Sequence, residues 1–333
     1  MAEVDASAER LKSTADEIVA LLKQVIIGQD RAMQEVLTAF FAGGHCMITG
    51  VPGVAKTLLV ESLSKIMDLS FKRIQFTPDL MPSDITGTEI LEEDMTTGRR
   101  ELRFVPGPVF ANIVMADEIN RTPPKTQAAL LESMQEKQVT LGGRTYPLEM
   151  PFFVLATQIP FEQEGTYPLP EAQQDRFMFN VRMDYLNEGD EVAVVKRSTG
   201  FSEVELTPLI SKADLLAYQD LILKAQVPES LVDYIVELVS SSRPGNANAP
   251  DFVNEYIAWG AGLRASQYIV LGAKSRAAMS GRMVASAEDV RAVMEPVMRH
   301  RIGLSFRADV DKVTVEDVIG RLVENMPVPA AAG

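Results

Sequence analysis

Gly50-Val51-Pro52-Gly53-Val54-Ala55-Lys56-Thr57 is the stretch that decides the fold, and it is nearly a phosphate-binding P-loop. It follows the short apolar run Cys46-Met47-Ile48, as a P-loop follows a buried strand. Its glycines and proline predict a tight turn whose backbone N–H groups converge on phosphate oxygens. Lys56 is placed to reach the β- and γ-phosphates and the Thr57 hydroxyl to ligate Mg²⁺, and the helix that begins near Lys56 adds its dipole.

One position departs from the general P-loop pattern. Ala55 stands where a glycine usually precedes the lysine. Because alanine has no easy access to positive φ, we expect residue 55 to have a negative, helix-compatible φ. Taken alone, the segment is also compatible with a glycine-rich turn that only joins a strand to a helix.

A second segment, Ile113-Val114-Met115-Ala116-Asp117-Glu118, is an apolar run that ends in two carboxylates. Such a run is typical of a parallel strand buried on both faces. At the carboxyl end of that strand, Asp117 is expected to hold Mg²⁺ through water and Glu118 to activate the attacking water as general base. An acidic strand exit without chemistry is the alternative, but it rarely supplies two carboxylates downstream of a P-loop. The two segments together predict binding and hydrolysis of a nucleoside triphosphate.

Composition narrows the class of protein. With 333 residues, 46% hydrophobic and 23% charged, the chain is long enough for two globular domains. Its net charge of −14 argues against nucleic acid as the main partner, because proteins that neutralise phosphates carry a basic face. The single cysteine, Cys46, is expected in the core, and His45 and His300 lack metal-ligand spacing. The charged N-terminus and the absence of a long apolar run predict a cytoplasmic protein that does not contact the membrane.

The order of predicted elements indicates an α/β domain followed by an all-α domain. Strands and helices alternate up to about residue 186, which predicts a parallel sheet with helices on both faces, and only helices follow. Two segments interrupt the alternation and read as hairpins around glycine-containing turns, at about 85–105 and at 138–146. We therefore divide the chain into an N-terminal helix, a nucleotide-binding core, a helical domain and a disordered tail, at 1–24, 25–190, 208–329 and 330–333.

Several longer strings resemble the MoxR family of AAA+ ATPases, from about residue 25 to 329. The P-loop is similar to the family's own version, Gly-Val-Pro-Gly-x-Ala-Lys-Thr, in which alanine replaces the usual glycine. Three further stretches match: residues 76–87 (FTPDLMPSDITG), 103–108 (RFVPGP) and 164–177 (EGTYPLPEAQQDRF).

The resemblance implies a P-loop core with strand order 5-1-4-3-2 and a C-terminal helical lid. It makes the hairpin at 85–105 the helix-2 insert and the one at 138–146 the pre-sensor-1 hairpin, although two ordinary surface hairpins remain an alternative. It further implies ATP and Mg²⁺ as cofactors and a ring, expected to be a hexamer. Its implied partners are a protein with a von Willebrand factor A domain and an enzyme client that is remodelled or matured.

Two arginines are assigned by the resemblance. Arg176 is similar to an arginine finger, which reaches the γ-phosphate of a neighbouring subunit, although a plain ion pair with the adjacent Asp175 is the alternative. Arg264 resembles sensor 2, and whether it acts on its own subunit or a neighbour stays open. The family usually has proline where Leu263 stands, so the entry into this helix is expected to be less rigid.

The remaining assignments concern the base and the attacking water. By resemblance, Ile26, Ile27 and Gly28 would line the adenine pocket, although such an apolar segment is equally compatible with the core. The family's Ala-Thr-Gln-Asn-Pro string reads ATQIP at residues 156–160, so Ile159 replaces the sensor 1 asparagine. Gln158 or Thr157 is then the candidate to orient the water.

Two hypotheses of function follow. The first is an Mg²⁺-dependent ATPase that acts as a chaperone-like ring. The second is an ATP-binding scaffold or switch with little turnover, which Ile159 motivates. A DNA-acting motor with the same insert is disfavoured by the charge of −14.

Overall fold

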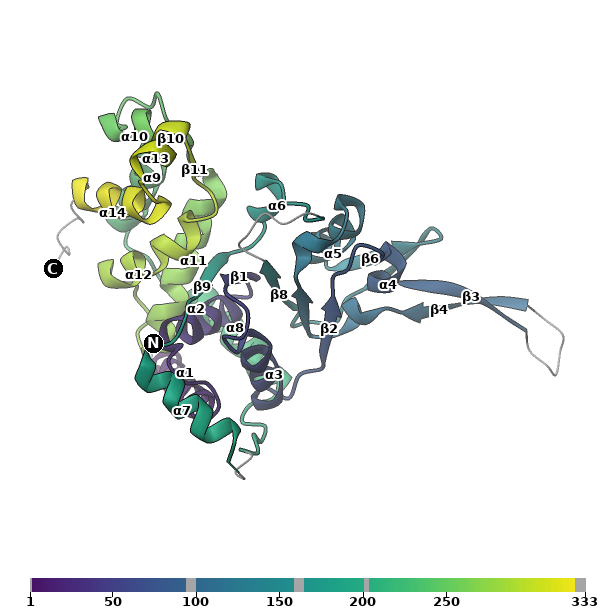
Figure 1. Ribbon diagram of the computed structural model, residues 1–333. Helices are drawn as coiled ribbons and strands as arrows, with labels where there is room; N and C mark the ends of the chain where they lie inside the picture. Colours follow the sequence, from purple (N-terminus) through teal and green to yellow (C-terminus); the bar gives the residue numbers. More distant parts are fainter. Residues whose placement is uncertain (1, 94–99, 159–164, 201–203, 327–333) are drawn as a thin grey trace.

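The computed structural model describes residues 2–93, 100–158, 165–200 and 204–326 (Figure 1). The predicted turn at residues 96–98, Ile159 and the predicted tail at 330–333 lie outside these ranges. Among the described residues, no helix combines the length and the apolar character required to cross a membrane.

A five-stranded parallel sheet forms the centre of the first domain, in the order β2-β5-β8-β1-β9. When the five strands are numbered along the chain, this is the predicted order 5-1-4-3-2, which is therefore confirmed. The strands are short, and their bounds are β1 (Cys46–Gly50), β2 (Phe71–Gln75), β5 (Ile113–Asp117), β8 (Phe153–Gln158) and β9 (Phe179–Met183).

The two faces of the sheet belong to two separate hydrophobic clusters, because side chains alternate along each strand. Ile48, Met115 and Leu155 pack in the larger cluster, whereas their neighbours Met47, Val114 and Val154 pack in the smaller one. The larger cluster contains side chains of α1 (Ala2–Lys23), α2 (Asp30–Phe41) and α3 (Lys56–Ile66). The smaller one is covered by α4 (Pro82–Thr86), η1 (Pro108–Phe110), η2 (Ile119–Arg121) and α5 (Pro124–Glu136). Helices on both faces are thus confirmed.

A helical lid follows the sheet through α7 (Glu188–Ser198) and lies beside it in Figure 1. Its central helix α11 (Leu263–Met279) contacts α1 and α2 of the first domain as well as its own neighbours. The large cluster is therefore continuous from the sheet into the lid. The other lid elements are α8 (Lys212–Lys224), α9 (Glu229–Ser241), α10 (Asp251–Tyr256), α12 (Ala287–Met298), α13 (Phe306–Asp311), α14 (Val315–Asn325), β10 (Ile257–Trp259) and β11 (Gly303–Leu304).

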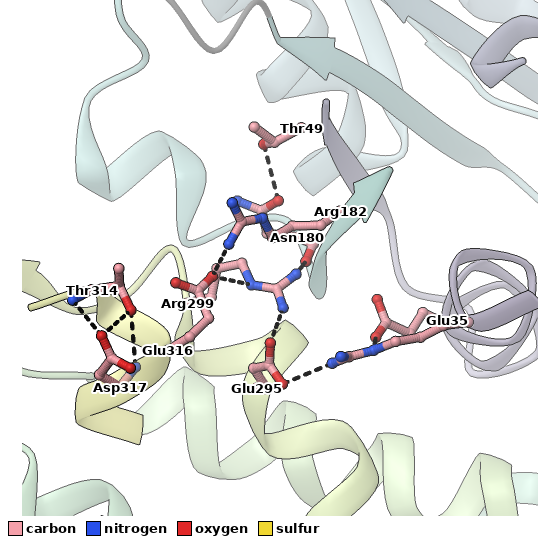
Figure 2. Close-up of polar contacts among 10 residues, drawn as sticks. Glu35, Thr49, Asn180, Arg182, Glu295, Arg299, Thr314, Glu316 and Asp317 are labelled. Carbon is pink, nitrogen blue, oxygen red and sulfur yellow. Dashed lines mark hydrogen bonds and ion pairs between the residues drawn. The ribbon is translucent and has the colours of Figure 1, made fainter. Parts of the chain in front are cut away.

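A polar network also joins the lid to the sheet (Figure 2). The Arg299 guanidinium is 6% exposed and donates to the Asn180 carbonyl of β9 over 2.7 Å. It forms ion pairs with Glu295 of α12 and, over 3.1 Å, with Glu316 of α14. The Asn180 side chain accepts a 3.0 Å hydrogen bond from Thr49, the residue before the P-loop. One buried cation therefore connects two lid helices with the strands beside the P-loop.

Both predicted hairpins are present. The first pairs β3 (Gly87–Glu93) with β4 (Arg100–Pro106) and projects away from the rest of the molecule in Figure 1. The second pairs β6 (Gln138–Leu141) with β7 (Arg144–Pro147). The Phe104 ring stacks on the Tyr146 ring at a centroid distance of 4.0 Å, so the two hairpins lie side by side.

Candidate nucleotide-binding site

The P-loop runs from the end of β1 to the start of α3. Gly53 has φ +84° and Ala55 has φ 65°, ψ 26°, so both lie in the left-handed region on either side of Val54. Our prediction of a negative φ for residue 55 is wrong. Alternation of left-handed and right-handed residues turns successive N–H groups inward to form an anion-binding nest, and this geometry overrides the preference of alanine. The left-handed conformation costs alanine about 1–2 kcal/mol.

Lys56 begins α3 and lies half-buried under the loop. Its ammonium donates to the Gly50 carbonyl over 2.5 Å. Burial lowers the pKa of Lys56, and the nearby carboxylates of Asp117 and Glu118 oppose that shift. The lysine is thus held at the loop between its backbone and the acidic strand end.

Thr157 of β8 organises the two carboxylates at the end of β5. Its hydroxyl, on a side chain that is buried, donates to Asp117 Oδ1 over 2.6 Å and accepts from the Glu118 N–H over 2.8 Å. Glu118 has φ 57°, and its carboxylate accepts from Arg121 over 2.8 Å and from Gln75 over 3.1 Å. Asp117 therefore faces the loop with a fixed orientation, and Glu118 is turned out of the strand beside it.

One cleft of about 450 Å³ collects most of the predicted site. Carboxyl ends of parallel strands meet at one edge of the sheet, which explains why residues distant in sequence converge there. The predicted residues that line it are Gly50, Pro52, Gly53, Ala55, Lys56, Thr57, Asp117, Glu118 and Gln158. Val51 and Val54 of the loop are not among its lining residues, and Val54 is buried in the core.

Arg73 also lines this cleft, and the sequence reasoning missed it. Its guanidinium from β2 forms an ion pair with Asp117, with Nε 3.1 Å from Oδ2. The sequence feature that could have indicated Arg73 is its alternation with Gln75 in β2, because both side chains then lie on one face of the strand. β2 pairs with β5 so that Gln75 lies opposite Asp117. That neighbour relationship is needed before the pattern points to the site.

The predicted adenine segment is not among the lining residues of the cleft. Ile26 is buried in the large cluster, and Gly28 lies against Leu186 and Asp190 at the start of α7. The next residue, Gln29, donates to the Asp184 carbonyl over 3.0 Å. Gly28 and Gln29 thus contact the connection from β9 to the lid, whereas Ile26 belongs to the core.

Arg176 and Arg264 line a second cleft, of about 230 Å³, which shares no lining residue with the first. Arg264 donates to Asp175 over 2.6 Å, and Arg176 donates to the Leu131 carbonyl over 2.9 Å. Behind them, Arg301 pairs with the same Asp175 over 2.7 Å, and the Tyr268 hydroxyl donates to the Arg176 carbonyl over 3.2 Å. The lid therefore contacts the loop that carries Arg176.

The first cleft fits a triphosphate with Mg²⁺. The cations Lys56 and Arg73 and the N–H groups of the loop suit phosphate, and the Thr57 hydroxyl and the Asp117 carboxylate are the hard oxygen ligands that Mg²⁺ prefers. Comparison with known families agrees with this reading. Residues 45–179 match the ATPase family associated with various cellular activities (AAA), and residues 251–322 match the AAA lid domain.

Full-length relatives decide the family. Chaperone MoxR1 of Mycobacterium tuberculosis is 42% identical over 316 residues, which cover 95% of this chain and 82% of the relative. The chain belongs to the MoxR family of AAA+ ATPases. Protein MoxR of Methylorubrum extorquens is 30% identical over 92% of this chain and 93% of its own. A crystal structure from Cytophaga hutchinsonii superimposes on this MoxR-family chain with a TM-score of 0.90 at 40% identity, covering 98% of both chains.

Proposed function

We propose that this protein hydrolyses ATP with Mg²⁺ and uses the energy to remodel or mature a partner protein or enzyme complex. The observation that carries the proposal is the convergence of Lys56, Thr57, Asp117 and Glu118 on one cleft at the carboxyl edge of the sheet. A phosphate-binding lysine and two ordered carboxylates are the groups that phosphoryl transfer to water requires.

Each residue has a distinct task in this proposal. Lys56 binds the β- and γ-phosphates, and Thr57 and Asp117 would hold Mg²⁺, which when bound neutralises charge on those phosphates. Glu118 accepts the proton of the attacking water. Gln158 and Thr157 are the polar groups of β8 at the cleft, and Gln158 orients the water in place of the missing sensor 1 asparagine.

Arg176 and Arg264 act on a neighbouring copy of the chain. They line a cleft distinct from the one that contains their own Lys56, which supports a role at the nucleotide of a second molecule. In the isolated chain Arg264 pairs with Asp175 and Arg176 with the Leu131 carbonyl, so binding to phosphate would replace these contacts. We therefore propose a closed ring, a hexamer, in which Arg176 is the arginine finger and Arg264 is sensor 2, both in trans. An arginine finger contributes about 10³–10⁵-fold to the rate.

The two hairpins form the proposed contact with the client. Leu91 and Leu102, opposite one another in β3 and β4, are 61% and 57% exposed, and such apolar side chains on a projecting hairpin favour contact with protein rather than nucleic acid. The name of the Mycobacterium tuberculosis relative, a chaperone, supports this reading. We also propose a von Willebrand factor A domain protein as partner and the cytoplasm as the location.

Steady-state ATP hydrolysis of the wild type and of Glu118→Gln tests the proposal. The glutamine keeps the size of the side chain but cannot accept a proton, so we expect turnover to fall by about 10²–10⁴-fold while ATP binding persists. A wild type that binds ATP but hydrolyses it no faster than the variant would instead support the scaffold hypothesis. A wild type that does not bind ATP would refute both.

A further inference from the structure

The second cleft contains one cationic residue, Lys137, that has no role in the mechanism proposed so far. Its ten lining residues include Lys137, Arg176 and Arg264, together with His45, and none of the ten is a carboxylate. In a protein of net charge −14, three cationic side chains line one cleft of about 230 Å³, and such a local concentration of positive charge favours anions. Arg264 is partly neutralised by Asp175, whereas no residue in the described part of the chain pairs with the Lys137 ammonium.

Lys137 is fixed to the molecule through its backbone. It ends α5 in the left-handed region, with φ 53° and ψ 30°, and its N–H donates to the Ser133 carbonyl over 3.0 Å. Its own carbonyl accepts from the Leu148 N–H over 2.9 Å, and β6 begins at the next residue. Lys137 therefore stands at the joint between α5 and the β6–β7 hairpin.

The charge of Lys137 acts inside this cleft. His45, another lining residue of the cleft, has its pKa lowered to about 4, mainly by burial and further by the positive charge of Lys137. The Nδ1 atom of His45 accepts from the Val154 N–H over 3.0 Å, which agrees with a neutral ring. Histidine therefore adds no charge at neutral pH, and the positive potential comes from the lysine and the two arginines.

We propose that Lys137 is a third phosphate-binding residue of the cleft and contacts the triphosphate held by the neighbouring copy of the chain, beside Arg176 and Arg264. This inference rests on the proposed ATPase function and adds a specific residue to it. Because Lys137 also begins the β6–β7 hairpin, its contact links the neighbour's nucleotide to a surface that we assign to the client.

Because Lys137 has a left-handed backbone, a glycine at this position removes the positive charge without straining the fold. Glycine favours positive φ, so Lys137→Gly removes the ammonium and relieves the backbone at the same time. Lys312 is a matched control, because it also ends a helix in the left-handed region, with φ 56° and ψ 36°, but it lies in the lid at the end of α13 and lines neither cleft. We expect both glycine variants to melt at or above the temperature of the wild type.

ATP turnover then tests the proposal. We expect kcat/KM to fall roughly 10- to 100-fold in Lys137→Gly, to be mostly retained in Lys137→Arg, and to be unchanged in Lys312→Gly. To test action in trans, Lys137→Gly is mixed with Lys56→Ala, which cannot use its own site but carries an intact Lys137. We expect the mixture to hydrolyse ATP faster than the sum of the two separate proteins.

The outcomes are distinguishable. A Lys137→Gly variant as active as Lys312→Gly would overturn the inference and leave the proposed function standing. A loss of activity that mixing does not restore would also overturn it, because Lys137 would then act on its own subunit. If the wild type and Glu118→Gln hydrolyse ATP equally slowly, the proposed function fails and the inference fails with it.

Discussion

Replacement of Arg301 by methionine should destabilise the protein and loosen the loop that carries Arg176. The Arg301 side chain is 2% exposed and donates five hydrogen bonds. Two of them reach Asp175, at the carboxylate and at the carbonyl, both over 2.7 Å. The others reach the carbonyls of Phe177, Met178 and Val297, over 2.6, 3.2 and 2.5 Å.

The expected loss of stability depends on which hydrogen-bond partners the acceptors of Arg301 keep after the substitution. Breaking a buried ion pair costs about 3–5 kcal/mol. Asp175 is 29% exposed and keeps its pairing with Arg264, and the Phe177 carbonyl keeps His300 at 3.0 Å, so we take the lower end of this range. Removing a buried guanidinium also recovers its desolvation cost, and this burial already lowers the pKa of Arg301. We expect a loss of about 3 kcal/mol, which leaves a chain of ordinary stability folded.

Urea denaturation measures the effect with two probes. Circular dichroism reports the whole chain, and the fluorescence of Trp259, the single tryptophan, reports the lid. Arg301→Lys is the matched control, because it keeps the charge but has three donors and no planar fork, and we expect a smaller loss. A decrease of less than about 1 kcal/mol for Arg301→Met would refute the reasoning, because the five hydrogen bonds would then do no more than offset desolvation.

Three further predictions concern the site and its surroundings. Ala55→Gly should raise the free energy of unfolding by about 0.5–1 kcal/mol, because glycine relieves the left-handed backbone, and a decrease in denaturation experiments would contradict this. Thr157→Val removes the hydroxyl between Asp117 and the Glu118 N–H and should lower the free energy of unfolding by about 1–3 kcal/mol. Because Asp117 would lose its fixed orientation, we also expect half-maximal ATP hydrolysis to require a higher Mg²⁺ concentration. An unchanged dependence on Mg²⁺ would argue against Asp117 as a ligand of the metal. Burial lowers the pKa of both His45 and His300, so as the pH falls these histidines are protonated in the unfolded chain before they are protonated in the folded chain. The free energy of unfolding should therefore decrease by about 1 kcal/mol per histidine between pH 6.5 and 5.5. Replacing His300 by a neutral residue should make the free energy of unfolding less dependent on pH in this range.

The sequence predicted those parts of the molecule that depend on local pattern. Continuous apolar runs such as Ile113–Asp117 identify strands buried on both faces, and their alternation with helices leads to a parallel sheet. Polar residues at the carboxyl ends of such strands must then meet at one edge of the sheet, so the proximity of Asp117 and Lys56 could be predicted from the sequence. The family resemblance supplied the strand order and the two arginines.

Other features depend on contacts that local pattern does not record. The conformation of Ala55 is imposed by the closure of the loop, which outweighs the preference of a single residue. Arg73 becomes a site residue only because β2 lies beside β5. Arg301 carries no motif, yet five acceptor atoms from two parts of the chain, residues 175–178 and Val297, surround it. Its importance is visible only after the lid has packed against the Arg176 loop.

The anchored base of the β3–β4 hairpin has a mechanical consequence. The backbone is closely packed at this base. A Cβ atom added to Gly87 would lie 2.3 Å from the Val105 carbonyl oxygen, and a Cβ atom added to Gly107 would lie 2.3 Å from the Ile85 carbonyl oxygen. We therefore expect the two strands to move together. Helix α4 contacts α5, which follows Glu118 in the chain. The seven residues of β3 extend about 23 Å, so tilting the base by about 10° sweeps the far end of that strand through about 4 Å. A shift of about an ångström near the carboxylates, if it tilted the base in this way, would thus displace the far end of the hairpin by about the length of a side chain.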